Sequence, residues 1–545
     1  LLNDMPQNYS DFNLPRNAYT AFDATSLKSL IKQRLSENTV FTGQNYEASN
    51  MSGLIDVIAY SYHVLLFYLN QTATESMFSE AELYENMNRI VKTIDYKPVG
   101  YQSSILTFEA TGTASLPANT YTIPRYTFFN VGGIHFTVNA DITFTKTVDT
   151  ESKLTDLSTN NLLYQGRFRE YPIVTAIGED FETVVLVPGD NIIIDHFNID
   201  VYVKDVDTGK WSEWERTTSL YLEKSVARKY EVRLNEHKRY ELKFGNDNTG
   251  KKLKTGDEIA IYYLQSSGSQ GQVGPKVINR SKLSKYEAPQ FITIFNDIKD
   301  DNIKYMTQEQ MLHMSFTNAN GSSEYYEGEN VDDIRNNAPK LFGTQYRLVT
   351  KDDYEAYIKQ NYNNMIRDIK VVNNWDYVDG HMKYNLETIG TTKNNNEPRT
   401  LLNQVNFADA CDFNNVYCYV LPRIKQTTTN NPRANYLTPA QKSTILSGLR
   451  DKKTLGAEII IADPVFVAVD MLTYDPNKED LTPDLASVSE LKIVRSNQSS
   501  KSFESIKTKA YKIITDYFDS FEFGGTLDVS LLQNKIFEIG DIAAI

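Results

Sequence analysis

The sequence predicts a multidomain α+β protein with an N-terminal helical region, central all-β domains, and a C-terminal α+β unit that contains a β–α–β element and ends in helices. Its 545 residues are more than one hydrophobic core can organise. Apolar residues recur every three or four positions before residue 100 and after residue 500, which is typical of helices. Between 101 and 295 they alternate with polar residues, and Val, Ile, Thr, Tyr and Phe are abundant, as in strands.

The helical region is predicted to contain one segment around residues 27–35, a second at about 50–70 and a third at about 74–94, with Lys97 and Pro98 marking its end. The second is apolar nearly all round, so it must be covered on more than one side. Two interpretations remain open: an ordinary intramolecular bundle, or docking against helices of another chain. The apolar run 54–69 contains Asp56 and His63 and is shorter than the roughly 20 residues that span a bilayer, so we expect a buried helix in a soluble assembly.

Changes in composition and in the spacing of apolar residues divide the rest of the chain. We expect a helical domain over 1–100, β-rich domains over 101–295, a linker and helix over 296–360, an α+β domain over 361–475 and a helical region over 476–545. Thr350 with Asp353, and Thr438 with Gln441, predict two capped helix starts. The last region should hold helices at about 501–519 and 527–539.

Composition indicates a protein that makes contacts. With 56 Lys+Arg and 70 Asp+Glu the net charge is −14, which disfavours sequence-blind nucleic-acid binding and anionic membrane surfaces. The 35 Tyr and 26 Phe residues suit wide interfaces as well as cores. The first ten residues do not have the basic and then apolar pattern of a secretory signal.

No pattern of catalytic, cofactor-binding or metal-binding residues stands out. Cys411 and Cys418 are the only cysteines and are expected to be free thiols, and the six histidines are scattered singly. The glycine-rich run 267–274 lacks the Lys-Ser/Thr of a phosphate loop, so we expect a turn. The segments 205–209 and 246–250 resemble calcium loops but fit hairpins better. We therefore expect a protein without cofactor, metal or enzymatic activity.

Three stretches together resemble the baseplate wedge proteins of contractile-tailed bacteriophages, the T-even-like wedge subunit in particular, and the broader baseplate J-like family. The first runs from 41 to 98 and leads from FTGQNYEAS into the apolar helix. The second, YELKFGNDNTG through GSQGQVG, carries Phe244, Gly245, Gly250, Gly256, Ile259, Tyr263, Gly268, Gly271, Val273 and Gly274. The third, TQYRLVTKDDYEAYI, carries Arg347, Val349, Thr350, Asp353, Tyr354 and Glu355. The late segment 437–471 also falls where the family has a β–α–β unit, so the resemblance covers positions 40 to 475.

The resemblance implies a structural, non-enzymatic subunit that forms a dimer. Two copies would clasp other wedge proteins through their N-terminal helices, while the C-terminal regions link six wedges into a ring around the tail tube that rearranges on sheath contraction. Sheath-initiator or hub-proximal proteins would be further partners. The location would be the virion tail, assembled in the host cytoplasm, without nucleic-acid binding or membrane insertion. The expected contact residues of the helical head are Leu54, Ile55, Ile58, Tyr62, Leu65, Leu66, Leu69, Met77 and Tyr84, and those of the C-terminal region are Phe503, Ile506, Tyr517, Leu532 and Ile536.

Three alternatives remain. The β-rich, Tyr-rich centre is compatible with a receptor- or glycan-binding tail protein, although the sequence has no internal repeat. A glycan hydrolase would need a close carboxylate pair in a concave pocket. The equivalent baseplate component of a tailocin or contractile secretion system would share the same architecture.

Overall fold

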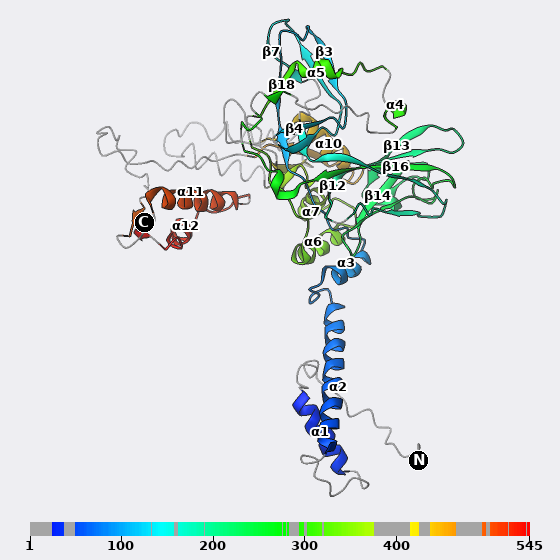
Figure 1. Ribbon diagram of the computed structural model, residues 1–545, viewed down its shortest axis with the longest axis vertical. Helices are drawn as coiled ribbons and strands as arrows, with labels where there is room; N and C mark the ends of the chain where they lie inside the picture. The colour runs from blue at the N-terminus through cyan, green and yellow to red at the C-terminus, as the bar shows by residue number, and fades with distance from the viewer. Residues whose placement is uncertain are drawn as a thin grey trace.

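The computed structural model describes residues 24–37, 50–131, 133–156, 162–189, 191–274, 276–278, 281–282, 294–298, 302–318, 321–374, 376, 415–423, 436–464, 493–496, 502–521, 523–540 and 542–544. Within these ranges, helices lie at the N-terminal end, β-sheets in the middle, and an α+β unit and a helical pair towards the C-terminus (Figure 1). The predicted fold class is therefore confirmed.

A long helix extends away from the rest of the molecule. α1 (Ala24–Glu37) packs beside the far part of α2 (Asn50–Glu75), where Lys28 pairs with Asp56 at 2.5 Å (Figure 1). Its 26 residues make α2 about 39 Å long at the helical rise of 1.5 Å per residue. We call α1 and α2 together the stalk.

The expected helix over 74–94 is interrupted. α2 ends at Glu75, and α3 (Tyr84–Lys92) begins nine positions later in a new direction (Figure 1). Met87 and Val91 of α3 pack with Ile334 and Ala338 of α6 (Val331–Thr344). Along the predicted stripe, Met77 is exposed, whereas Ala81 and Val91 are buried against the body, and α3 therefore joins the body of the molecule.

A small β domain follows, built from three sheets around one core. The core is lined by Leu106, Phe108, Phe136 and Phe144 with other buried residues. One sheet has the order β1-β9-β5-β4, the second β17-β18-β2-β7, and the third β3-β6-β8. The strands are β1 (Ile105–Thr107), β2 (Glu109–Gly112), β3 (Asn119–Ile123), β4 (Phe128–Val131), β5 (Ile134–Thr137), β6 (Ile142–Lys146), β7 (Ser152–Lys153), β8 (Thr155–Asp156), β9 (Leu162–Gln165), β17 (Ser281–Lys282) and β18 (Met314–Thr317).

Part of the expected linker belongs to this domain. β18 pairs with β2 in antiparallel register, and Phe316 lies opposite Ala110. Met306, Met311 and Met314 are buried in the same core, and α5 (Gln308–Leu312) precedes the strand; the short α4 (Phe295–Ile298) lies further upstream. The polar composition around 296–335 hides this segment because its strand pairs with residues about 200 positions away.

The central domain is a seven-stranded sheet with the order β10-β16-β12-β13-β14-β15-β11. Only β13 and β14 run parallel among its named pairs. Trp214, Tyr230 and Phe244 pack in its core. The strands are β10 (Arg167–Thr175), β11 (Thr183–Val185), β12 (Ile193–Lys204), β13 (Trp211–Thr217), β14 (Lys229–Leu234), β15 (Tyr240–Lys243) and β16 (Glu258–Ser266).

Two motif glycines of the central domain allow a close backbone approach. A Cβ at Gly245 would lie 2.2 Å from the carbonyl oxygen of Gly250, which itself has φ +75°. We expect Gly245→Ala to lower the free energy of unfolding by about 1–3 kcal/mol, as overpacking does. Urea unfolding measures this cost, and Gly274→Ala is the matched control, because its Cβ would lie 3.8 Å from the Val277 side chain, which is ordinary van der Waals contact. Equal effects of the two substitutions would contradict the packing argument.

The α+β domain confirms the β–α–β prediction. β20 (Asn415–Pro422) runs parallel to β21 (Glu458–Ala462), with α10 (Pro439–Leu449) between them in sequence. β19 (Ile366–Asn373) pairs with the other side of β20, and α7 (Lys351–Tyr362) packs on β19. Both predicted capping boxes are present: Thr350 with Asp353 begins α7, and Thr438 with Gln441 begins α10.

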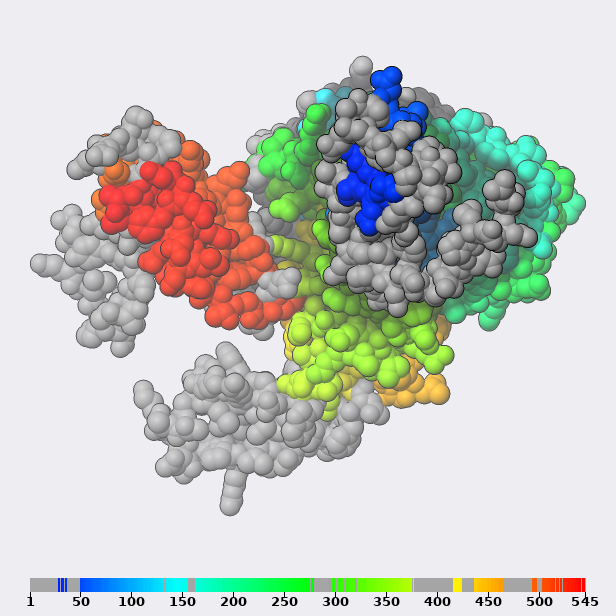
Figure 2. Space-filling model, turned by 90° about the horizontal axis from the view of Figure 1, so that it is seen from below, coloured from blue at the N-terminus to red at the C-terminus, as the bar shows by residue number. Residues whose placement is uncertain are grey.

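The two predicted C-terminal helices are present as α11 (Phe503–Asp519) and α12 (Val529–Phe537). Their shared core contains Tyr517, Leu532 and Ile536, and β22 (Val494–Arg495) pairs with β23 (Ile542–Ala544). Seen from below, the pair forms its own lobe beside the body (Figure 2). The backbone N–H of Phe523 donates to Asp368 of β19 at 3.4 Å.

Candidate partner-binding surface

The stalk exposes large apolar side chains on nearly all sides. Only Ile55 and Ala59 of α2 are buried, and Ile55, which is 2% exposed, was an expected contact residue. Among the other expected contacts, Leu66 is half-buried, and the rest in α2 are exposed: Leu54, Ile58, Tyr62, Leu65 and Leu69. Sequence reasoning missed four exposed residues of the same helix, Val57, Tyr60, Phe67 and Tyr68. Isolated soluble chains rarely present an apolar surface of this extent, which is typical of an interface.

The two expected contacts beyond α2 have different surroundings. Met77 is exposed just after the end of α2. Tyr84 is partly buried at the α3–α6 contact, where Asn88 donates to its hydroxyl at 3.1 Å and the Lys238 ammonium lies 4.8 Å from its ring. Burial raises the pKa of Tyr84 to about 12, with Asn88 acting in the opposite direction. Tyr84 therefore fastens α3 to the body of this chain.

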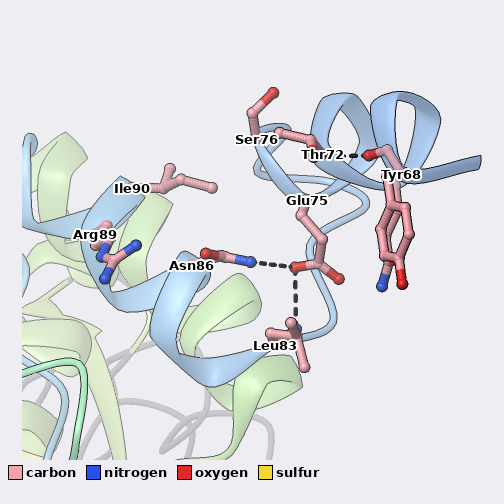
Figure 3. Close-up of a pocket in the computed structure, with 9 residues that line it drawn as sticks. Tyr68, Thr72, Glu75, Ser76, Leu83, Asn86, Arg89 and Ile90 are labelled. Carbon is pink, nitrogen blue, oxygen red and sulfur yellow. Dashed lines mark hydrogen bonds between the residues drawn. The ribbon is translucent and has the colours of Figure 1, made fainter. Parts of the chain in front are cut away.

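The corner between α2 and α3 is hollow, and Glu75 fixes its shape. A cavity of about 470 Å³ lies there, lined by Tyr68, Glu75, Leu83, Arg89 and Ile90 among others (Figure 3). The Glu75 carboxylate accepts hydrogen bonds from the backbone N–H groups of Glu82 and Leu83 at 3.3 and 3.2 Å and from Asn86 at 3.0 Å. Because Leu83 has no side-chain cap of its own, Glu75 takes over the capping of α3. These hydrogen bonds, that of Asn86 above all, lower the pKa of Glu75.

Removing this carboxylate should loosen the corner. We expect Glu75→Ala to broaden the distribution of distances between a spin label near the tip of α2 and one on the central sheet, because α3 loses its only cap from α2. Pulsed electron spin resonance measures the distribution. Glu80→Ala, at an exposed position of the same turn, is the control and should leave it unchanged. An unchanged distribution for Glu75→Ala would show that the corner is held by packing alone.

Ionic and polar contacts anchor residues 95–99, the segment after α3 that we call the connector. The Lys97 ammonium lies 2.9 Å from the Glu231 carboxylate of β14, and the Arg233 Nε atom lies 2.6 Å from the same group. Glu231 is fully buried. Burial opposes ionisation of Glu231, but Lys97 and Arg233 outweigh it and lower its pKa. Asp95 completes the network by accepting from Arg233 and, at 2.8 Å, from the Tyr346 hydroxyl.

A second buried carboxylate, Glu329, fastens the same connector to α6. Its oxygens accept from the Tyr96 hydroxyl at 2.7 Å, from the backbone N–H of Val99 at 2.9 Å and from Asn337 at 2.8 Å. Burial raises the pKa of Glu329, and these donors partly offset the effect. Residues 95–99 are therefore held from two directions.

The C-terminal contact residues divide into core and surface. Ile506, Tyr517, Leu532 and Ile536 are buried within the chain itself, so their side chains are not available as a free surface. Phe503 is 67% exposed, and the Arg495 guanidinium lies 4.7 Å from its ring. The exposed apolar residues that sequence reasoning missed here are Tyr511, Leu527, Val529, Leu531 and Phe537.

The motifs that resembled ligand loops serve as turns. Asp205 accepts from the backbone N–H groups of Asp207 and Thr208, and Asn246 accepts from those of Asn248 and Thr249. These are the local hydrogen bonds of Asx turns. In the described part of the chain, no group of three His, Cys, Asp or Glu side chains is placed to hold a metal ion.

The Cys418 thiol is not placed for chemistry. Cys418 is buried and free, and burial raises its pKa to about 12, whereas Cys411 lies outside the described residues. A thiol that stays protonated at neutral pH is a poor nucleophile.

By length and composition alone, one helix of the described residues could cross a membrane, namely α2. The apolar run was expected to be too short for this, but the helix extends beyond that run at both ends and is 26 residues long. The sequence also predicted a buried helix, whereas most of α2 is exposed in the single chain.

Comparison with known proteins supports the family resemblance. No family model matches the chain. Over 367 residues this chain is 23% identical to the baseplate wedge protein gp6 of Enterobacteria phage T4. The aligned region covers 62% of this chain and 50% of that protein. The chain thus spans about half the length of the curated relative it matches. A solved structure of the anti-feeding prophage (AFP) baseplate aligns with 95% of this chain and 92% of its own, at 11% identity and a TM-score of 0.25, too low to support an argument about the fold. The resemblance predicted from the motifs is confirmed, and in sequence this chain is similar to a baseplate wedge protein of a phage.

Proposed function

We propose that this chain is a structural, non-enzymatic subunit of a contractile-tail baseplate. The observation that carries the proposal is the stalk, whose exposed apolar residues surround a helix about 39 Å long. The similarity to a phage baseplate wedge protein supports a place in the virion tail. We propose that the chain is assembled into the tail in the host cytoplasm.

The stalk has the chemistry of a permanent interface. Burying one Leu, Ile or Phe side chain contributes roughly 1.5–3 kcal/mol, and α2 offers nine exposed side chains that are large and apolar. A surface of this kind favours helices from other chains, which can cover both sides of α2 as a bundle. We assign this role to the α2 of a second copy of the chain together with helices of other baseplate proteins.

The other end of the molecule supplies the lateral contact. The α11–α12 lobe lies beside the body (Figures 1 and 2), and its surface carries Phe503, Tyr511 and Val529. Two copies joined at the stalk and linked to neighbours through these lobes would connect six wedges into a ring around the tail tube. The ring would rearrange during sheath contraction while the stalk contacts persist.

Electron microscopy of the chain with its co-expressed baseplate proteins tests this arrangement. We expect closed rings of six-fold symmetry with two copies of the chain per wedge. Rings in which the stalk is solvent-exposed, or stable monomers in the presence of every baseplate protein, would contradict the proposal.

The length of α2 suggests one competing environment, a lipid bilayer. We place α2 in a protein interface because α1 lies along it, with the Lys28–Asp56 ion pair fixing the contact. Liposome flotation separates the two environments. Flotation of the free chain that a charge in α2 abolishes, without assembly into rings, would favour the membrane.

A further inference from the structure

A second cavity lies under the base of the stalk, in the seam between the connector 95–99, the central sheet and the α6–α7 pair. Its volume is about 210 Å³, and its wall includes Lys97, His196, Arg216, Tyr346 and Gln360. It is distinct from the hollow at the α2–α3 corner.

Arg216 of β13 brings to this wall a positive charge without a direct ion pair in the described part of the chain. Its Nη1 atom donates to the His196 carbonyl oxygen at 2.6 Å, and its Nη2 atom lies 2.7 Å from His196 Nε2. The Arg216 Cζ atom lies 5.2 Å from the centroid of the Phe197 ring. Lys97 and Arg233 each pair with a carboxylate, but in the described part of the chain no carboxylate lies within 4 Å of Arg216. Burial lowers the pKa of Arg216, whereas the nearby Tyr230, Tyr240 and Asp195 act in the opposite direction.

His196 adds an unused donor next to this cation. The residue is 3% exposed, and burial together with Arg216 lowers its pKa well below the usual value, so the imidazole is neutral at pH 7. Because Arg216 donates to Nε2, the ring proton must lie on Nδ1. Nδ1 is buried and makes no hydrogen bond among the described residues.

The acidic residue in the wall does not neutralise the cavity. Asp95 accepts from Arg233 and from the Tyr346 hydroxyl, and Glu231 is occupied by Lys97 and Arg233. Around this seam Lys97 and Arg233 are thus paired, whereas Arg216 has no carboxylate within 4 Å in the described part of the chain, and its attraction to Asp195 acts over a longer distance. A partly buried guanidinium without a direct ion pair has planar donors that match the oxygens of a carboxylate or phosphate.

We propose that this cavity is a binding site for one small oxyanion of the phosphate or carboxylate class, with Arg216 as its charged anchor and Lys97 in the same wall. The volume is below the roughly 300 Å³ at which pockets for drug-sized ligands begin, so the ligand is a single anionic group. Such an anion joins the connector under the stalk to the central sheet, and its binding stiffens the joint. The inference concerns the free chain and does not depend on the proposed role in a baseplate.

Calorimetric titration of the full chain with inorganic phosphate, and separately with acetate, tests the site at constant ionic strength set by chloride. We expect saturable binding of at least one of the two anions and a rise in melting temperature with its concentration. Arg216→Gln should weaken binding at least tenfold, and Arg216→Lys, which keeps the charge but loses the planar fork, should weaken it less. Arg228→Gln removes an exposed arginine nearby in sequence and should leave binding unchanged.

The outcomes divide cleanly. Binding that depends on Arg216 supports the site, and the preferred anion identifies its class. Absence of saturable binding by both anions, or equal binding by the wild type and the Arg216 variants, overturns it. If Arg216→Gln fails to fold, the comparison of Arg216→Lys with the wild type decides.

Discussion

Replacing Leu65 and Leu69 of α2 with Glu is expected to abolish assembly while leaving the free chain folded. The two side chains are 62% and 59% exposed, so charging them removes little from the core of the single chain. Surface substitutions of this kind usually change the free energy of unfolding by about 0.5 kcal/mol or less. In an assembled bundle, the same two carboxylates would be buried in an apolar contact without partners.

The expected loss of affinity is large. Each leucine contributes roughly 1.5–3 kcal/mol when buried, and desolvating an unpaired charge adds to the penalty. We therefore expect at least a 100-fold weaker association, measured by analytical ultracentrifugation with the co-expressed partners. Gln71→Glu adds a charge at an exposed polar position of the same helix and should assemble normally. Normal assembly of the double variant would show that α2 is not the docking surface.

Replacing Glu231 with Ala is expected to destabilise the chain strongly. The carboxylate is fully buried between Lys97 and Arg233 and also accepts from the backbone N–H of Leu220 at 3.2 Å. Its removal leaves two cations without their shared partner, and breaking a buried ion pair in this way costs about 3–5 kcal/mol. Glu231→Gln keeps an acceptor and should cost less.

Denaturant unfolding measures these differences, with Glu215→Ala as the control, since Glu215 is an exposed carboxylate on the neighbouring strand β13. The pH dependence gives an independent check. Because the pKa of Glu231 is lowered in the folded chain, its contribution is fully present above the unfolded pKa of about 4.3 and is lost as pH falls through the folded value. The stability difference between the wild type and Glu231→Gln should therefore shrink on acidification below about pH 4. A difference that stays constant with pH, or a cost for Glu231→Ala no larger than that for Glu215→Ala, would contradict the role of the network.

Local patterns in the sequence predicted the local parts of the fold. The caps at Thr350 and Thr438 and the parallel pair around α10 depend on residues close together in sequence, and the structure has them as expected. β18 escaped prediction because its partner β2 lies about 200 residues upstream, so no local pattern marks the pairing.

The candidate surfaces were harder to predict for a physical reason. An apolar stripe indicates that a helix face is buried, but it does not say what covers that face. In the single chain Leu65 stays exposed, whereas Ile536 is covered by the neighbouring helix of the same chain. The network at the stalk base joins Lys97 to Glu231 and Arg233 more than 130 residues away, and scattered charges in the sequence carry no sign of it.

The firm attachment of residues 95–99 makes the stalk a lever arm. A helix about 39 Å long converts a tilt of about 10° at its base into a displacement of roughly 7 Å at its tip. Because Glu231, Glu329 and the Glu75 corner resist bending between body and helix, a small rotation of the central sheet is delivered to the tip rather than absorbed at the joint. A particle that changes diameter could in this way transmit motion through the chain without remaking any contact at the tip.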